Sequence, residues 1–188
     1  MPPRIKFNKE DIIAASIKLI QDEGVESLTA RKIAERLGSS VKPIFTWFTN
    51  MEDLKSSVIS EAERINGEFI SNEMNKVGCP PYKLVGLAYI NFARVEPNLF
   101  KLLYMRDRSD EIKPNSEEDK EKNRALYEMI MKTANLTFDE AYMFHLEMWI
   151  FVHGIASMIV TNYLEWDYDF INKALTDMYQ GLLRRVKE

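Results

Sequence analysis

The sequence has little of what disulfide-rich or metal-dependent proteins need. It has one cysteine, Cys79, which excludes an internal disulfide and has no partners for a zinc cluster. Its two histidines, His145 and His153, lie two turns apart on a predicted helix, and no carboxylate or thiol stands near them at metal-ligand spacing on the same face. We therefore expect no metal site and no cofactor.

Signatures of catalysis and of membranes are also lacking. We find no Ser/His/Asp set, no phosphate-binding glycine loop and no metal-ligand pattern, so we expect that the chain is not an enzyme. No apolar run looks long enough to span a bilayer, and the N-terminus lacks a hydrophobic signal segment. Together with the scarcity of cysteine, these absences favour a cytoplasmic location away from the membrane.

What the chain does have is helical periodicity and a large apolar fraction. Of its 188 residues 46% are hydrophobic, which suffices for a small domain fused to a larger one. We expect an all-α fold, with a three-helix domain at 1–50 and a larger helical bundle at 51–188 that begins with a connector helix at 51–75. Further helices are predicted at Tyr82–Arg94, from Pro97 through Tyr104, and at Glu118–Ala134, Phe138–Tyr163 and Asp169–Lys187.

The charge is unevenly distributed between these parts. The net charge is −4, but residues 1–50 hold eight Lys or Arg and six Asp or Glu, which gives +2 there and −6 in the remainder. A basic N-terminal part is suited to contact with phosphate, and an acidic remainder is suited to stay away from it.

Several helix ends are marked by capping residues. Asn8 is placed to cap the first helix and Gly24 to end it, Asn50 is placed to cap the helix that follows the three-helix domain, and Pro97 fits the first turn of a later helix.

Residues 28–48 have the pattern of two short helices joined by a glycine turn. Gly38 favours the left-handed conformation that ends a helix, and Ser39 or Ser40 is placed to cap the next one. The apolar residues expected on one face of each helix are Ile33, Ala34 and Leu37 in the first and Ile44, Phe45 and Phe48 in the second. This is the pattern of a helix-turn-helix, whose second helix lies in the DNA major groove.

Residues 8–54 resemble the DNA-binding domain of the tetracycline-repressor (TetR) family. The resemblance rests on Leu37-Gly38 and on the run Pro43-Ile44-Phe45-Thr46-Trp47-Phe48-Thr49-Asn50-Met51-Glu52-Asp53-Leu54. A second match, Phe92-Ala93, Pro97, Phe100, Trp149 and His153-Gly154, resembles the WHG type of TetR ligand-binding domain.

Two departures from the family pattern concern phosphate contacts. Phe45 stands where the family commonly has a tyrosine, and Met51 where it often has a lysine. More of the basic contribution must then come from Arg4, Lys6, Arg31, Lys32 and Lys42.

The resemblance implies a DNA-contacting set on the second and third helices. The candidate DNA-binding residues are Thr29, Arg31, Ser40, Val41, Lys42, Pro43, Phe45, Thr46 and Trp47. Thr29 and Arg31 are placed to hold a phosphate, the alternative being a plain cap and a solvated charge. Lys42 can donate to guanine or to phosphate, whereas Trp47 either packs on the DNA backbone or fills the domain core.

The predicted helix 138–163 is apolar on all sides, so two surfaces must bury it. One surface has aromatic residues with polar tips, as a small-molecule pocket requires. The candidate ligand-binding residues are Tyr89, Phe92, Met105, Tyr127, Met131, Tyr142, His145 and Trp149. The candidate dimer-interface residues are Phe151, Gly154, Ile155, Met158, Ile171, Ala174, Met178 and Gly181. For any one of these residues, ordinary core packing is the alternative.

These patterns predict a ligand-responsive, DNA-binding transcription regulator. Its expected partners are a palindromic double-stranded DNA operator, a small and largely apolar effector, and a second copy of the chain; release of a repressor by the effector is the family's commonest behaviour. Two alternatives stay open, an enzyme built on a helical bundle and a DNA-independent helical sensor or protein-interaction module.

Overall fold

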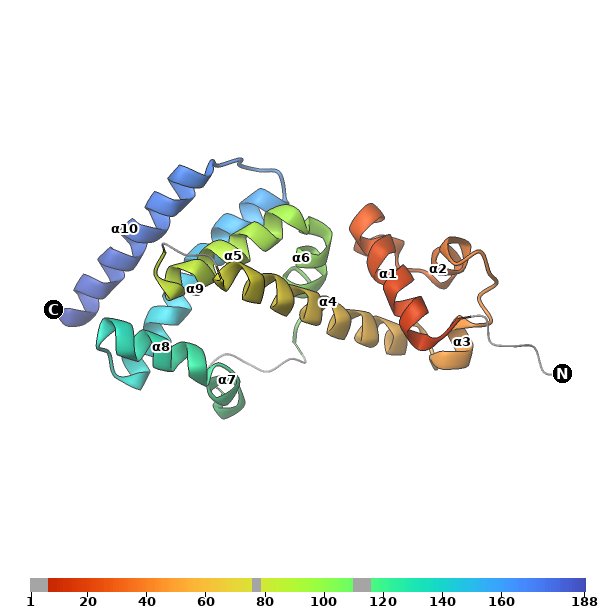
Figure 1. The fold of residues 1–188 in the computed structure, drawn as a ribbon, viewed down its shortest axis with the longest axis horizontal. Coiled ribbons are helices and arrows are strands. Elements are labelled where there is room, and N and C mark those ends of the chain that lie inside the picture. Colours follow the sequence, from red (N-terminus) through yellow and green to blue (C-terminus); the bar gives the residue numbers. More distant parts are fainter. Residues whose placement is uncertain (1–6, 76–78, 110–115) are drawn as a thin grey trace. The chain divides into compact units, whose positions relative to one another are not determined.

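The computed structural model describes residues 7–75, 79–109 and 116–188, and these residues form helices and no strands (Figure 1). The predicted all-α fold class is confirmed. The helices are α1 (Lys9–Glu23), the 3-10 helix η1 (Val25–Ser27), α2 (Ala30–Arg36), α3 (Ile44–Trp47), α4 (Met51–Met74), α5 (Pro81–Val95), α6 (Pro97–Tyr104), α7 (Glu117–Lys122), α8 (Arg124–Ala134), α9 (Phe138–Val160) and α10 (Tyr168–Lys187).

The chain packs into two compact units. The first unit ends at Phe69 within α4 and also takes in Val95–Arg106, which carries α6. The second unit consists of Ile70–Arg94 and Asp107–Glu188 and holds most of α5 together with α7 to α10. The unit that contains the helix-turn-helix is therefore larger than the predicted domain at 1–50, because it also includes most of α4 and all of α6.

The ends of α1 form as the sequence indicates. The amide of Asp11 donates to Asn8 Oδ1 at 2.7 Å, and the amide of Asn8 donates to the Asp11 carboxylate at 2.9 Å, so the two residues form a capping box. Gly24, with φ at 86°, ends the helix, and its amide donates to the carbonyl of Ile20 at 2.8 Å. Both predicted ends are confirmed.

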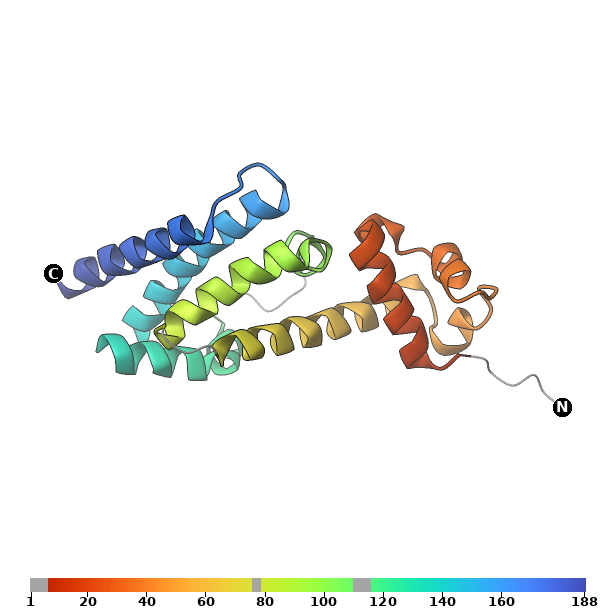
Figure 2. The ribbon, with the colours of Figure 1, turned by 45° about the horizontal axis from the view of Figure 1, so that its top comes forward.

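The core of the helix-turn-helix is built by α1, α2 and α3, because α1 packs against both of the shorter helices (Figure 2). Ile33 and Ala34 of α2 are buried, as are Ile44 and Phe48 at the two ends of α3. Phe45, which was expected on the same buried face, is instead 47% exposed. That expectation was wrong because α3 is only four residues long, so its buried side is narrower than the sequence pattern suggested.

The turn between α2 and α3 differs from the prediction in one respect. Gly38 has φ at 59°, as a left-handed turn residue should. The residue that precedes α3 is Pro43, and no side chain caps the helix, so the predicted cap by Ser39 or Ser40 is wrong. The amide of Phe45 instead donates to the Val41 carbonyl at 3.4 Å, so the turn itself leads into α3.

The middle of the chain completes the first unit through α6. This helix packs against α1 and η1, and Pro97 occupies its first turn as predicted. Gln21 at the end of α1 donates its side-chain amide to the Glu96 carboxylate at 2.9 Å, and Asn98 donates to the Gln21 carbonyl at 3.0 Å. Hydrogen bonds in both directions therefore join the end of α1 to the start of α6.

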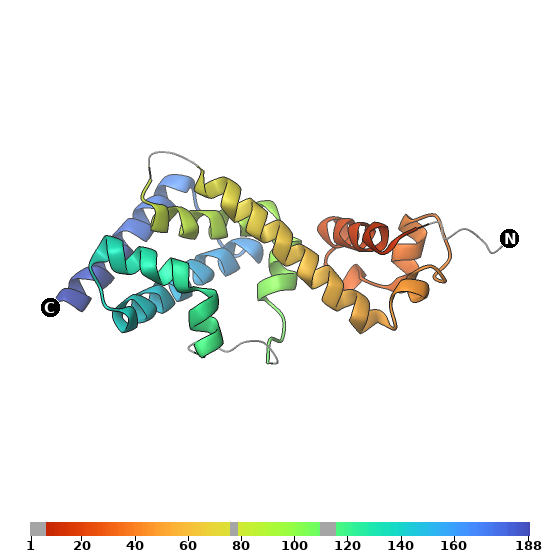
Figure 3. The ribbon, with the colours of Figure 1, turned by 60° about the horizontal axis from the view of Figure 1, so that its bottom comes forward.

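The second unit is organised around α9, which packs against α8 and α10. The predicted helix 118–134 is in fact two helices, because α7 ends at Lys122 and the chain turns at Asn123 into α8 (Figure 3). The Asn123 side chain donates to the Asp119 carbonyl at 3.1 Å and to its carboxylate at 2.9 Å. This local side-chain bonding competes with a continuous helix, as asparagine commonly does.

By length and composition α9 could cross a membrane, which corrects the expectation that no apolar run is long enough. In the structure one side of this helix is buried and another is exposed. Ala141, Phe144, Val152 and Ala156 are buried within the second unit. The ring of Phe144 lies 5.1 Å from that of Tyr179 on α10, edge to face.

Replacement by alanine should have opposite effects on stability at two glycines of the first unit. Gly38→Ala should lower the free energy of unfolding by about 1 kcal/mol, because the left-handed backbone at Gly38 disfavours any residue with a Cβ. Steric contact would not contribute, since no atom lies within 4 Å of the added Cβ. Gly67→Ala, in regular and exposed helix, should raise it by about 0.5–1 kcal/mol. Urea unfolding of both variants measures this, and a shift of equal sign in the two would contradict the argument.

Candidate nucleic-acid interface and ligand cavity

The turn before α3 and α3 itself leave a row of side chains outside the core. The exposed members of the predicted DNA-binding set in this segment are Ser40, Val41, Lys42, Phe45, Thr46 and Trp47, while Pro43 is half-buried. Lys42 forms no ion pair with any residue that the structure describes. Its ammonium group is therefore available to an external anion.

Trp47 does not fill the core. It is 41% exposed, and its indole Nε1 donates to the carbonyl of Phe7 at 3.0 Å. This bond fixes the chain just before α1 next to the end of α3. The Thr46 hydroxyl donates a hydrogen bond to the Lys42 carbonyl at 3.0 Å, so the methyl group is the part of this side chain that remains to contact a base.

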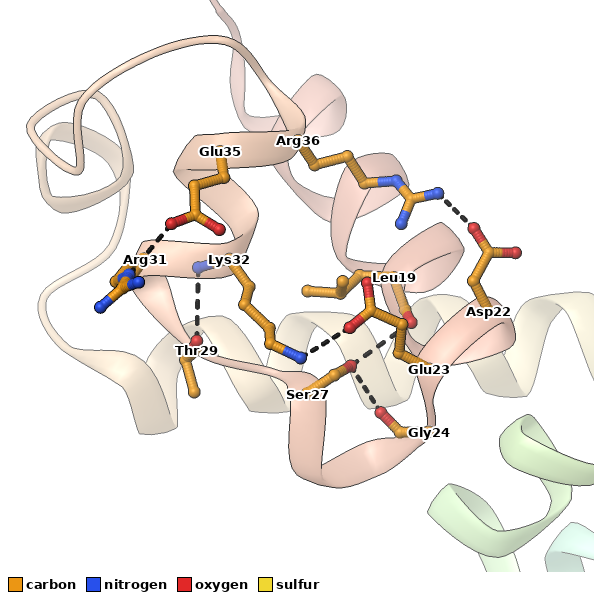
Figure 4. Close-up of polar contacts among 10 residues, drawn as sticks. All are labelled: Leu19, Asp22, Glu23, Gly24, Ser27, Thr29, Arg31, Lys32, Glu35 and Arg36. Atoms are coloured by element: carbon orange, nitrogen blue, oxygen red, sulfur yellow. Dashed lines mark hydrogen bonds and ion pairs between the residues drawn. The ribbon is translucent and has the colours of Figure 1, made fainter.

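The cations of α2 are all engaged within the helix-turn-helix (Figure 4). Arg31 donates from Nε to Glu35 at 3.0 Å, and its side chain is 87% exposed. Thr29 caps α2 by accepting a hydrogen bond from the amide of Lys32 at 3.3 Å, so it has the capping role that was the alternative to phosphate contact. A phosphate would have to compete with Glu35 for Arg31.

Two further ion pairs join α2 to α1 (Figure 4). Lys32 Nζ lies 2.6 Å from Glu23, and the Arg36 guanidinium contacts Asp22. The Arg36 guanidinium, followed by the Lys18 ammonium, lowers the pKa of the Asp22 carboxyl below its usual value. Of the other predicted cations, Arg4 and Lys6 lie outside the described residues.

The second unit contains a cavity of about 380 Å³, within the range of small-molecule sites. Helices α5, α9 and α10 supply most of its wall. The lining residues are Pro80, Pro81, Tyr82, Lys83, Val85, Gly86, Tyr89, Thr133, His145, Met148, Trp149, Val152, Leu175, Thr176, Tyr179 and Gln180.

Two tyrosine–histidine hydrogen bonds join α5 to α9 at this wall. The Tyr82 hydroxyl lies 3.1 Å from His145 Nδ1, and the Tyr89 hydroxyl 2.9 Å from His153 Nδ1. The Trp149 ring stacks on His153 with a centroid distance of 5.3 Å. Burial lowers the pKa of His145 to about 4, so this imidazole is neutral at pH 7. Burial also raises the pKa of the Tyr82 hydroxyl, which keeps it protonated.

The predicted ligand-binding residues divide into three groups. Tyr89, His145 and Trp149 line the cavity. Tyr127 and Tyr142 are buried behind it, and the Tyr127 ring lies 5.7 Å from that of His145. The remaining three lie elsewhere, with Phe92 fully buried, Met131 half-buried on α8, and Met105 exposed in the first unit.

Several lining residues went unpredicted, most notably Tyr82 and Lys83 on α5 and Tyr179 on α10. A signal for one of them was present in the sequence. Tyr82 and Tyr89 are seven residues apart, so they share one face of α5 two turns from each other.

The predicted dimer-interface residues differ in how far they are exposed to solvent. Ile155 and Ile171 are buried inside the second unit and have no surface for a partner. Met158 is 37% exposed, and a Cβ added at Gly154 or Gly181 would meet no atom within 4 Å. Phe151, Ala174 and Met178 are half-buried.

Within residues 7–75, 79–109 and 116–188, no three His, Cys, Asp or Glu side chains are grouped to hold a metal ion.

A helix-turn-helix joined in one chain to a helical unit with a ligand-sized cavity defines the class of helix-turn-helix transcription regulators. Family models agree with this class. Residues 12–58 match the bacterial regulatory proteins of the tetR family, and residues 83–181 match the tetracyclin repressor-like C-terminal domain. The chain therefore belongs to the TetR family of transcription regulators.

Solved structures share the fold over nearly the whole chain. A protein of unknown function from Rhodococcus sp. RHA1 matches with a TM-score of 0.67 at 15% identity, covering 98% of each chain. A TetR family member from Streptomyces coelicolor A3 matches with a TM-score of 0.61 at 16% identity, covering 94% of this chain and 98% of that one. A TetR variant from Acinetobacter baumannii AYE in complex with minocycline has a TM-score of 0.61 at 17% identity and covers 97% of each chain. No curated protein matches in sequence.

Glu35→Gln should strengthen DNA binding several-fold at low salt, because it releases Arg31 and removes a negative charge from the same exposed surface. The gain should shrink as salt is raised. Glu121→Gln is the matched control, since it breaks a comparable exposed pair with Arg124 in the second unit. Fluorescence anisotropy with labelled duplex DNA measures both, and equal affinities for the two variants would refute the competition between Glu35 and phosphate.

The neutral His145 predicts a loss of stability in acid. Between pH 6.5 and about 4 the unfolded chain binds a proton at this residue that the folded chain does not, so stability falls as the pH is lowered through this window. His145→Gln should lose less stability over the same interval, by up to about 1.4 kcal/mol per pH unit. Urea unfolding at pH 7, 6 and 5 tests this, and parallel curves for the two proteins would argue against a neutral His145.

Proposed function

We propose that the chain is a homodimeric, ligand-responsive repressor that a small and largely apolar effector releases from a palindromic DNA operator. The observation that carries the proposal is the exposed row on α3 and the turn before it. Ile44 and Phe48 are buried there, while Val41, Lys42 and Phe45 are left facing solvent. Exposed apolar side chains beside an unpaired lysine are suited to thymine methyl groups together with guanine or phosphate acceptors.

Regulation by an effector is supported by the path of the chain. Helix α5 lines the cavity with Tyr82 and Tyr89 and ends at Val95, and Pro97 begins α6, which is held by hydrogen bonds to α1. A ligand that binds one conformation of the cavity better than another shifts the equilibrium between them. Since α5 and α6 are covalently joined, that shift would bear on the unit that carries the helix-turn-helix.

A two-fold dimer through α9 and α10 is supported by surface left open on both helices. Met143 and Ile150 on α9 are 49% and 59% exposed, and Gly154 follows on the same face with free space around it. On α10, Ala174, Met178 and Gly181 recur at helical spacing. Small and apolar residues in this arrangement allow close packing of four helices, two from each copy.

The test is selection of random duplex DNA by the purified chain, followed by footprinting of the enriched sequence. The proposal expects a short palindrome, because the two helix-turn-helix domains of a two-fold dimer would bind two equivalent half-sites. Lys42→Ala should bind the selected duplex about tenfold or more weakly at fixed salt while its unfolding curve stays unchanged.

Lys132→Ala, which removes an exposed lysine of the second unit, controls for the change of net charge. Absence of any enriched sequence at low salt would favour a DNA-independent sensor or protein-interaction module instead. Equal affinity of Lys42→Ala and Lys132→Ala for the duplex would remove Lys42 from the interface.

A further inference from the structure

The charge of the cavity wall is unbalanced. Among the lining residues that the structure describes, Lys83 is the only one with a charged side chain, and no carboxylate accompanies it. Aromatic and aliphatic side chains make up most of the rest. A wall of this kind attracts an anion and repels a cation.

Lys83 has donors to spare. It lies half-buried in the first turn of α5, and its ammonium group donates to Thr176 Oγ1 on α10 at 2.6 Å. The neighbouring Asp177 does not neutralise it, because that carboxylate pairs with Lys173 at 2.6 Å. Lysine has three donors, and the structure gives Lys83 one partner among the described residues, so two hydrogens remain for a ligand.

The other titratable groups of the wall add no negative charge at pH 7. His145 is neutral because burial lowers the pKa of its imidazole to about 4. Burial raises the pKa of the Tyr82 and Tyr179 hydroxyls, so both stay protonated. The first turn of α5 holds no acidic residue, so this turn brings no negative charge to the positive end of the helix beside Lys83.

The polar and apolar parts of the wall are separated. Thr176 and Gln180 are exposed lining residues, as are Pro80 and Pro81 next to Lys83, so the lysine lies toward the rim. Tyr89, Met148, Val152 and Leu175 are buried lining residues and form the interior. A charged group at the rim keeps part of its hydration, while an apolar body fills the interior.

We propose that the effector of this cavity is an apolar molecule with one carboxylate or a comparable anionic group, whose charged end binds Lys83 beside Thr176 and whose body lies against Tyr89 and Trp149. This inference rests on the proposed function only in taking the cavity as the effector site. We expect a cationic ligand of similar size to bind less tightly, because it would meet the like charge of Lys83 and no carboxylate among the lining residues.

The test uses three probes with the same ten-carbon chain and different head groups: decanoate, decanol and decyltrimethylammonium. Isothermal titration calorimetry of the full chain at pH 7 should show decanoate binding about tenfold or more tightly than decanol, as expected for a charge-assisted hydrogen bond. Decyltrimethylammonium should bind most weakly. No DNA is present, so the result does not depend on whether the chain recognises an operator.

Lys83→Met keeps the aliphatic stem of the lysine and removes its charge. It should bind decanoate and decanol about equally, with the affinity for decanol unchanged, and Lys83→Arg should restore the preference for decanoate. Equal binding of all three probes by the natural chain, or an unchanged preference in Lys83→Met, would overturn the anionic ligand but leave the cavity as an effector site. Failure of all three probes to bind would overturn both.

Discussion

The packing of α6 against α1 ties the middle of the chain to the helix-turn-helix. Gln21 at the end of α1 donates to Glu96, and Asn98 donates back to the Gln21 carbonyl, so the first unit holds a segment from the middle of the chain. Because α5 ends at Val95, only one residue separates the helix that lines the cavity from a helix fixed to α1. Covalent continuity therefore links the cavity to the helix-turn-helix whatever the arrangement of the two units.

Charge pairing decides which side chains remain available to ligands. The cations of α2 are bound to Glu35, Glu23 and Asp22, whereas Lys42 and Lys83 have no carboxylate partner among the described residues. Exposed ion pairs contribute little to stability, but each must be broken before its cation can bind another anion. Lys42 lies in the first unit, in the turn before α3, and Lys83 lies in the second unit, at the cavity rim.

Much of the fold could be predicted because helix ends depend on neighbouring residues. The caps at Asn8 and Gly24 and the proline that opens α6 form as their local chemistry dictates. Prediction from the sequence was wrong where two local preferences compete. At Asn123 the side chain donates to the backbone carbonyl of Asp119, one turn earlier, and a helix that periodicity predicts to be continuous is divided there. Phe45 is apolar but exposed, and periodicity gave no indication of this because a four-residue helix buries only a narrow side.

The all-α class, the helix-turn-helix and the apolar character of α9 could be predicted without the structure, since each follows from residues near one another in the chain. The residues that line the cavity, in contrast, come together through the packing of helices that are distant in the chain. Tyr82 and Lys83 come from the start of α5, His145 from α9 and Tyr179 from α10, and packing of these helices brings them to one wall. Periodicity identifies the buried face of a helix but not the helix that covers it, because that choice depends on how side chains from distant segments fit together.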